Sequence, residues 1–414
     1  MAAHKVPLHY GWIVVFAGLL TVFACLGIGR FALGMLLPSM GVNLDLNYSQ
    51  MGFISTGNFV GYLVAVLISG YLMRRLGARK LIFLALLIIG ISMVWISRTN
   101  HFLAILALYI VTGFGSGAAN IPIMGLISHW FAPHKRGKAA GYMVVGNGLA
   151  IMFAGEFLPR INAAQGLEGW RTGWAFLGVI VLVISLICLL LLRNNPQSMG
   201  LIPVGESDNQ ATTKLAKPVE FSDRRKYIFH MGCIYFLFGF TYVIYATFVV
   251  TTLVQEWQFS EAQAGRVWFW IGFLSLFSGP IFGGLSDKLG RKTGLIIVFS
   301  LQTLAYLLIA STSELLFLYL SVGLFGLVAW SIPSIFAAMV GDYMGPQLAA
   351  TAFGYITFFF GIGQIVGPAL AGILAEQGGG FSSSYLMAAS MTAIAVVFTL
   401  LLKNPAITED PAHD

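Results

Sequence analysis

The sequence predicts an all-α membrane protein of twelve transmembrane helices in two homologous halves, and three observations support this fold class. First, 58% of the 414 residues are hydrophobic and 9% are charged, whereas soluble proteins carry about 25% charged residues. Second, twelve apolar runs are each long enough to cross the roughly 30 Å hydrocarbon core of a bilayer as a helix. Third, short motifs recur at a constant separation in the two halves. The composition excludes an ordinary water-soluble enzyme.

The predicted spans follow one another with short polar connections. They cover residues 11–38, 49–72, 80–97, 102–131, 138–159, 173–192, 228–253, 263–285, 293–311, 315–341, 350–374 and 385–402. The first run is too long for a signal-peptide core, so we treat it as a retained helix. The polar stretch 193–226 predicts a cytoplasmic linker between an N-terminal bundle, 1–192, and a C-terminal bundle, 227–414.

The basic residues predict the orientation of these helices. If the N-terminus is cytoplasmic, 18 of the 23 Lys and Arg residues fall in cytoplasmic segments, as the positive-inside rule requires. We therefore expect a multi-pass, monomeric protein of the cell inner (plasma) membrane with both termini in the cytoplasm. The net charge of +7 then has a topological origin, so the bilayer is the expected partner and nucleic acid is not.

The sequence carries no sign of a cofactor. Cys25, Cys188 and Cys233 lie in apolar runs without the spacing of metal ligands, and no phosphate-binding G-x-x-x-x-G-K-S/T loop occurs. We therefore expect no metal and no nucleotide.

Several motifs of the first half recur exactly 213 residues later. Gly70, Leu72, Leu76 and Gly77 correspond to Gly283, Leu285, Leu289 and Gly290, and Gly141-Tyr142 corresponds to Gly354-Tyr355. One match could arise by chance, but several at one separation predict two homologous bundles.

The loop after the eighth span reads Gly283-Gly-Leu-Ser-Asp287-Lys-Leu-Gly290-Arg291-Lys. It resembles the G-x-L-x-D-R/K-x-G-R-R/K signature of the major facilitator superfamily, and the twelve spans extend this resemblance over the whole chain. The resemblance implies two six-helix bundles around a central cavity that opens alternately to each side, secondary active transport, and no enzymatic activity.

The resemblance also implies a conformational switch at Gly283, Asp287, Gly290 and Arg291. Asp287 would pair with Arg291 when the protein faces outward, and breaking the pair would help to set the switching equilibrium. The alternative is a simple turn with positive-inside anchoring. Arg74 replaces the acidic residue in the first half, so any such control is expected to be asymmetric.

Two further segments resemble the bacterial monocarboxylate and oxalate/formate carriers. They are Tyr10-Gly-Trp-Ile-Val-Val15 and Arg193-Asn-Asn-Pro-Gln-Ser-Met-Gly-Leu-Ile-Pro203. That branch usually places a carboxylate-binding arginine in the eighth helix, where this chain has Gly279. The substrate of that branch therefore cannot be transferred to this chain.

Arg30, deep in the first span, is the most informative side chain. An arginine at bilayer depth costs roughly 3 kcal/mol unless it faces water or a partner. It can bind an anionic substrate, because guanidinium suits carboxylate, sulfonate or phosphate. Alternatively, it forms a permanent ion pair with Glu156 in the fifth span. Glu156 can also pair with Arg160, or carry a proton that couples two fluxes.

Other polar and aromatic side chains within the spans are candidates for completing a substrate site. They can bind a small ligand or simply hold helices together. These candidates are Asn58, Tyr62, Asn120 and Asn147 in the first half, and Tyr242, Tyr245, Trp330, Tyr355 and Gln364 in the second.

Together, these features predict a secondary transporter that moves a small, carboxylate-like organic anion by alternating access, coupled to protons. A carrier or exporter of neutral or hydrophobic compounds is the alternative within transport. A membrane receptor or sensor that binds a ligand without moving it is the alternative from another class.

Overall fold

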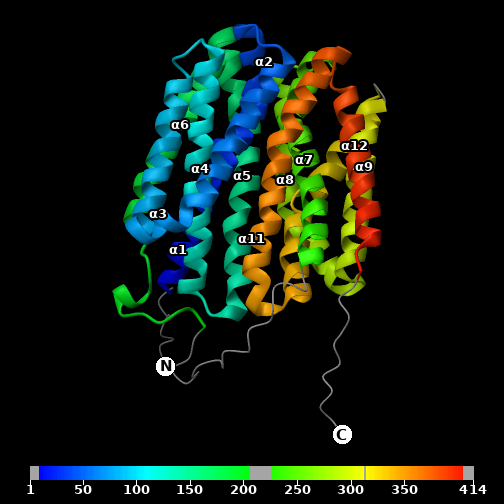
Figure 1. Cartoon of the computed structure of the whole chain (residues 1–414). Helices are drawn as coiled ribbons and strands as arrows, with labels where there is room; N and C mark the ends of the chain where they lie inside the picture. Colours follow the sequence, from blue (N-terminus) through cyan, green and yellow to red (C-terminus); the bar gives the residue numbers. More distant parts are fainter. Residues whose placement is uncertain (1–8, 206–224, 312–313, 404–414) are drawn as a thin grey trace, which may run out of the picture.

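The computed structural model describes residues 9–205, 225–311 and 314–403, and this part of the chain is almost entirely helical (Figure 1). The first bundle contains α1 (Tyr10–Val22), the π-helix η1 (Phe23–Phe31), α2 (Ala32–Leu44), α3 (Tyr48–Ile96), α4 (Phe102–Trp130), α5 (Pro133–Gln165), the 3₁₀ turn η2 (Gly166–Glu168) and α6 (Gly169–Leu191). The turn η3 (Gln197–Met199) follows. The second bundle contains α7 (Arg225–Gln255), α8 (Glu261–Leu289), α9 (Arg291–Ser311), α10 (Leu315–Val328), α11 (Ser331–Gly378) and α12 (Ser382–Leu401). Residues 206–224 of the predicted linker lie outside the described residues.

The helices account for the twelve predicted spans. In the described part of the chain, eleven helical segments are long and apolar enough to cross a membrane. One of them, α3, has 49 residues and contains two spans, because its backbone is broken at Gly77. α1, η1 and α2 together form the first span, and α10 continues into the first part of α11 as the tenth.

The turns that follow the second and eighth spans show the internal repeat in atomic detail. Gly77 and Gly290, which are 213 residues apart, have φ values of 72° and 90°, a region that favours glycine. The same relation holds two residues later: Arg79 Nε donates to the Leu189 carbonyl at 2.8 Å, and Lys292 Nζ donates to the Leu402 carbonyl at 3.1 Å. Each bundle therefore ties its third span to the end of its sixth.

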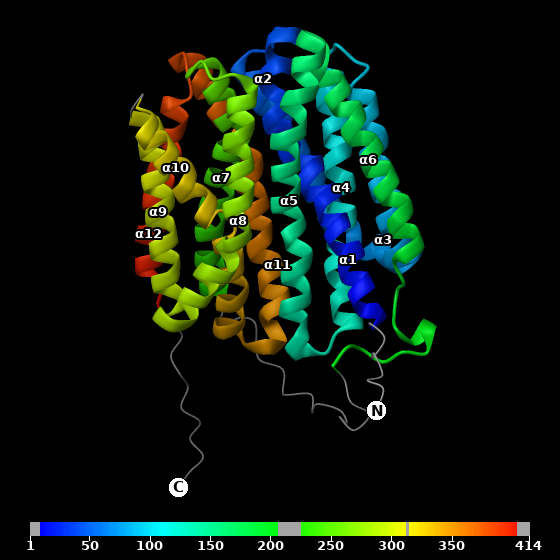
Figure 2. The same cartoon turned by 180° about the vertical axis from the view of Figure 1, so that it is seen from behind.

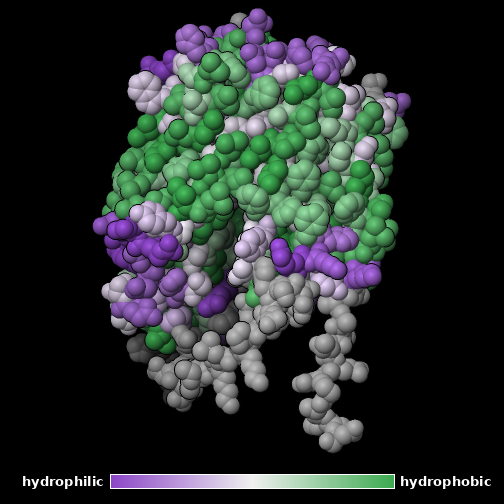
Figure 3. Space-filling model, in the orientation of Figure 1, coloured by the Kyte–Doolittle hydropathy of each residue, from purple (hydrophilic) through white to green (hydrophobic). Residues whose placement is uncertain are grey.

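The two ends of the molecule differ. We call the end where α1 begins and α12 ends the terminal face, and the opposite end the distal face. A broad hydrophobic belt separates hydrophilic residues at the two ends, and the surface is hollowed between the bundles near the terminal face (Figure 3). α5 and α8 approach each other toward the distal face and diverge toward the terminal face (Figure 2).

Glycine packing explains why the bundles meet at one end. A methyl group added to Gly155 of α5 would lie 2.6 Å from the Gly265 carbonyl of α8, and one added to Gly52 of α3 would lie 2.4 Å from the Pro368 carbonyl of α11. Such glycines allow two helix backbones to touch. Nearer the terminal face of α5, Gly141 has no atom within 4 Å of the same added group. The structure is therefore closed at the distal face and open at the terminal face.

Candidate functional site

The π-helix η1 brings the backbone of the first span close to α3 and α4. Side chains of these helices donate to its carbonyls: Ser116 Oγ to Cys25 at 2.6 Å, Asn58 Nδ2 to Gly29 at 3.0 Å and Tyr109 Oη to Arg30 at 2.9 Å. A π-helix widens the turn and is frequently found at functional sites. These bonds hold the backbone on which the Arg30 side chain is mounted.

The Arg30 guanidinium lies against two aromatic rings. Its central carbon is 4.7 Å from the ring centre of Phe59 and 4.5 Å from that of Tyr62. Such cation–π contacts are worth about 2 kcal/mol when desolvated. Its Nε and Nη2 atoms are nevertheless buried without a hydrogen-bond partner. Among the described residues, no acidic side chain forms an ion pair with Arg30, so the charge is held but not neutralised.

Amide groups surround this charge. Asn120 Nδ2 donates to the Tyr62 hydroxyl at 2.9 Å, so Asn120 and Tyr62 act as one unit. The amide oxygens of Asn58, Asn120 and Asn147 are buried without partners. Buried polar atoms normally have a partner, and those that lack one require an explanation.

The second bundle contributes an aromatic wall. The Trp330 ring lies 5.2 Å from the Phe31 ring and 5.7 Å from the Tyr242 ring, and Gln364 Nε2 donates to the Tyr242 hydroxyl. Arg30 interacts electrostatically with the hydroxyls of Tyr62 and Tyr242, one on each bundle. Arg30 therefore lies where the two bundles meet.

Trp330 occupies a break in the tenth span, between α10 and α11. Its backbone N–H donates to Ser278 Oγ at 2.9 Å instead of continuing the helix, and its indole Nε1 is buried without a partner. The indole N–H is thus another unused donor near the bundle interface.

The space on the distal side of Arg30 is nearly closed. The pocket bounded by Arg30, Asn58, Phe59 and Tyr109 holds about 10 Å³ of free room, roughly one water molecule. Ser55 and Thr247 close it with a hydrogen bond of 3.0 Å between the bundles. A larger ligand would therefore reach this cluster from the open, terminal side.

Three predicted residues lie elsewhere. The Tyr245 hydroxyl is hydrogen-bonded to Ser321 Oγ at 2.9 Å, away from Tyr242. Tyr355 is 55% exposed and borders a different groove. Glu156 pairs with Arg160, one helical turn away, and not with Arg30 in this conformation.

The predicted switch residues lie at the terminal face. Arg291 pairs with Asp287, and its Nε also donates to Asp342 at 3.0 Å. We expected the Asp287–Arg291 pair in an outward-facing state, yet it is formed here while the terminal face is open. Because Asp342 lies on α11, the cluster joins three helices of one bundle and does not bridge the two bundles. Gly290 supplies the turn that precedes Arg291, and Gly283 lies one and a half turns earlier on α8.

The sequence analysis missed Tyr109, Phe59 and Asp342. Tyr109 is the tyrosine of an otherwise apolar stretch in the fourth span, which was a usable signal. Phe59 could not be distinguished from ordinary packing aromatics. Asp342 follows Gly341 at the end of the tenth span, where an acidic residue is unusual among the basic ones.

Comparison with known proteins places this arrangement in a family. Residues 22–400 match the family described as "Uncharacterised MFS-type transporter YbfB". The hexuronate transporter of Bacillus subtilis is 23% identical over 91% of both chains. A probable sulfoacetate transporter, SauU, of Cupriavidus necator is 22% identical over 92% of this chain and 91% of its own.

Two further similarities bear on the site and the fold. The membrane sensor protein UhpC of Escherichia coli is 26% identical over 84% of this chain and 76% of its own. Among solved structures, a bacterial homologue of the human lysosomal transporter Spinster, inward-facing and unoccupied, superposes with a TM-score of 0.71 at 18% identity over 95% of both chains.

Proposed function

The chain belongs to the major facilitator superfamily of secondary transporters, and we propose that it carries a small organic anion bound at Arg30. The observation that carries this proposal is the state of the guanidinium, which has two buried donors without partners and no acidic neighbour paired with it. A charge at bilayer depth is costly, so an arginine left without a counterion suits a site that receives one. Relatives named for hexuronate and sulfoacetate, both organic anions, support the same class of cargo.

The remaining groups define the body of the ligand. We place the anionic end at Arg30, with Asn58, Asn120 and Asn147 offering acceptors for hydroxyl groups of the substrate. Trp330, Tyr242 and Gln364 would contact the other end from the second bundle. A small anion with a partly apolar or hydroxylated body fits this combination of one cation, amides and aromatic rings.

The basic residues suggest which side of the membrane the terminal face occupies. We propose that it faces the cytoplasm of a cell whose inner (plasma) membrane holds the protein as a monomer, because the positive-inside rule places Lys and Arg there. The conformation described here would then be open to the cytoplasm.

Ligand binding gives the direct test. The purified protein should be stabilised against heat by uronates, sulfonates or carboxylates, and R30A should abolish the stabilisation. R266A is a matched control, since Arg266 is an exposed arginine of α8 far from the cluster. Stabilisation by neutral or cationic compounds alone, or by anions in R30A, would overturn the proposal.

Proton coupling is a separate proposal and rests on Glu156, a carboxylate in the fifth span that is paired with Arg160. The test is anion uptake into proteoliposomes under an imposed pH gradient. Coupling through Glu156 predicts that E156Q loses gradient-driven uptake but keeps exchange of substrate. Full gradient-driven uptake in E156Q would exclude Glu156 as the coupling residue.

The similarity to a protein named as a membrane sensor favours one rival function. A sensor would bind the anion at Arg30 but would not move it. Counterflow of labelled substrate into proteoliposomes separates the two functions, because a transporter exchanges substrate and a sensor does not.

A further inference from the structure

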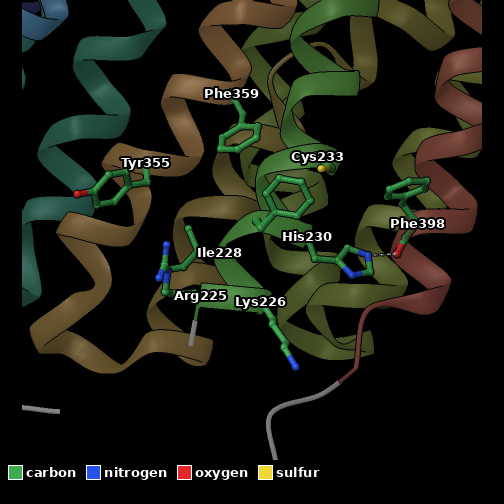
Figure 4. Close-up of a pocket in the computed structure, with 9 residues that line it drawn as sticks. Arg225, Lys226, Ile228, His230, Cys233, Tyr355, Phe359 and Phe398 are labelled. Carbon is green, nitrogen blue, oxygen red and sulfur yellow. Dashed lines mark hydrogen bonds between the residues drawn. The ribbon is translucent and has the colours of Figure 1, made fainter. Parts of the chain in front are cut away.

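A groove of about 900 Å³ lies between α7, α11 and α12 near the terminal face, away from the Arg30 cluster (Figure 4). The groove is lined by Arg225, Lys226, Ile228, Phe229, His230, Cys233, Tyr355, Phe359 and Phe398. Its aromatic rings are unusually open: Phe229 is 62% exposed and Phe398 is 37% exposed. In a protein that spans a membrane, such rings at the rim of the hydrophobic belt meet lipid.

The groove has built walls. Gly232 of α7 allows the Phe359 ring of α11 to approach, since an added methyl group would lie 2.9 Å from that ring. Phe229 packs edge-on against Phe359 with ring centres 5.7 Å apart. On the other side, His230 Nε2 donates to the Phe398 carbonyl of α12 at 2.8 Å. The floor between the three helices is therefore closed, and the open side is apolar.

The end of the groove nearest the terminal face is positively charged. Arg225 and Lys226 lie there, at the first turn of α7, and no acidic residue lines the groove. Basic residues at the membrane interface attract anionic headgroups by about 1 kcal/mol each. An apolar channel with a cationic end has the two-part chemistry of a phospholipid with an acidic headgroup.

The internal repeat shows that this charge is particular to the second bundle. A shift of 213 residues relates Phe229 to the exposed Phe16 and Tyr355 to Tyr142, so the aromatic parts are shared. The same shift relates Arg225, Lys226 and His230 to Trp12, Ile13 and Ala17. In the first bundle the Trp12 ring packs against Tyr142 with centres 6.0 Å apart. The basic end thus replaces an apolar contact that the fold does not require to be charged.

We propose that this groove binds an anionic phospholipid, with one acyl chain along Phe229, Phe359 and Phe398 and the phosphate at Arg225 and Lys226. The bound lipid covers exposed aromatic rings and neutralises both cations.

Cys233 provides a readout within the groove. It is partly exposed, whereas Cys25 and Cys188 are buried, so a maleimide reports on Cys233 in the full-length protein. In detergent, phosphatidylglycerol should slow this labelling and raise the melting temperature more than phosphatidylcholine with the same acyl chains. R225Q/K226Q should weaken the phosphatidylglycerol effect about 30-fold. R74Q/R75Q, which removes two exposed arginines outside the groove, should leave it unchanged.

Three results would overturn the proposal. One is equal protection of Cys233 by both lipids, and another is an unchanged phosphatidylglycerol effect in R225Q/K226Q. The third is equal protection by soluble glycerol phosphate, which would show a phosphate site that needs no acyl chain. If the double variant folds poorly, the single variants R225Q and K226Q, with the lipid stoichiometry measured by native mass spectrometry, supply the same comparison.

Discussion

At the scale of single residues, Arg30 combines two requirements that usually conflict. Its ring contacts with Phe59 and Tyr62 stabilise a charge in a poorly hydrated place, yet they use the faces of the guanidinium and not its N–H edge. The edge stays available because nearby side chains donate to backbone carbonyls of η1 instead of competing for the guanidinium. A planar cation is needed for this arrangement.

R30K tests whether planarity matters. Lysine keeps the charge but loses the stacking between two rings and the forked donor pair, so we expect anion affinity to fall at least about tenfold. Isothermal titration with whichever anion stabilises the wild type measures the change. Equal affinity in R30K would show that charge alone is recognised.

Y109F tests the support beneath Arg30. The variant removes the 2.9 Å hydrogen bond to the Arg30 carbonyl but keeps the ring, which packs against Trp174. We expect a loss of about 1 kcal/mol in the free energy of unfolding, with weaker anion binding as the η1 backbone loosens. Y319F, at an exposed tyrosine, is the control and should change neither quantity. Unchanged stability in Y109F would mean that the bond is replaced by water.

At the scale of helices, hydropathy predicts the spans well and their limits poorly. The predicted spans 49–72 and 80–97 are joined in α3, because polar residues outside the membrane continue the helix up to and beyond Gly77. The direction in which side chains point was harder to predict. Tyr242 and Tyr245 were expected on one face of α7, yet their hydroxyls bond to different helices. α7 is enclosed by protein on nearly all sides, so its apolar residues have no one-sided pattern to reveal its rotation.

The packed glycines of α5 and α8 give a prediction at this scale. In G155V the added side chain would collide with the Gly265 carbonyl in the distal-closed state, so we expect a shift toward a distal-open state. Spin labels at Arg75 and Lys288, on the terminal ends of α3 and α8, should then move closer together in a cysteine-free background. The matched control is G141V in the same helix, where the added group meets open space. A label separation unchanged by G155V would mean that α5 and α8 can separate locally without closing the terminal face.

At the scale of the whole molecule, polar contacts between the bundles accompany the glycine packing of the distal half. Glu376 of α11 accepts from the Tyr48 backbone N–H at the start of α3 at 2.8 Å, and Glu261 of α8 accepts from Asn162 of α5 at 2.7 Å. These pairs lie on the two sides of the bundle interface, one at α3–α11 and one at α5–α8. Hydrogen bonds to charged groups are worth about 1.5–3 kcal/mol each. Breaking both contacts should therefore change the balance between the two open states.

The double variant E376A/E261A tests this distal seal. A loss of about 3 kcal/mol or more from the distal-closed state corresponds to a population shift of over a hundredfold. Spin labels at Val42 and Ser382, on the distal ends of the two bundles, should move apart. E168A is the control, because Glu168 pairs with Arg171 inside the first bundle. If the distal separation stays the same while G155V changes the terminal one, the glycine-packed backbones hold the bundles closed without help from the carboxylates.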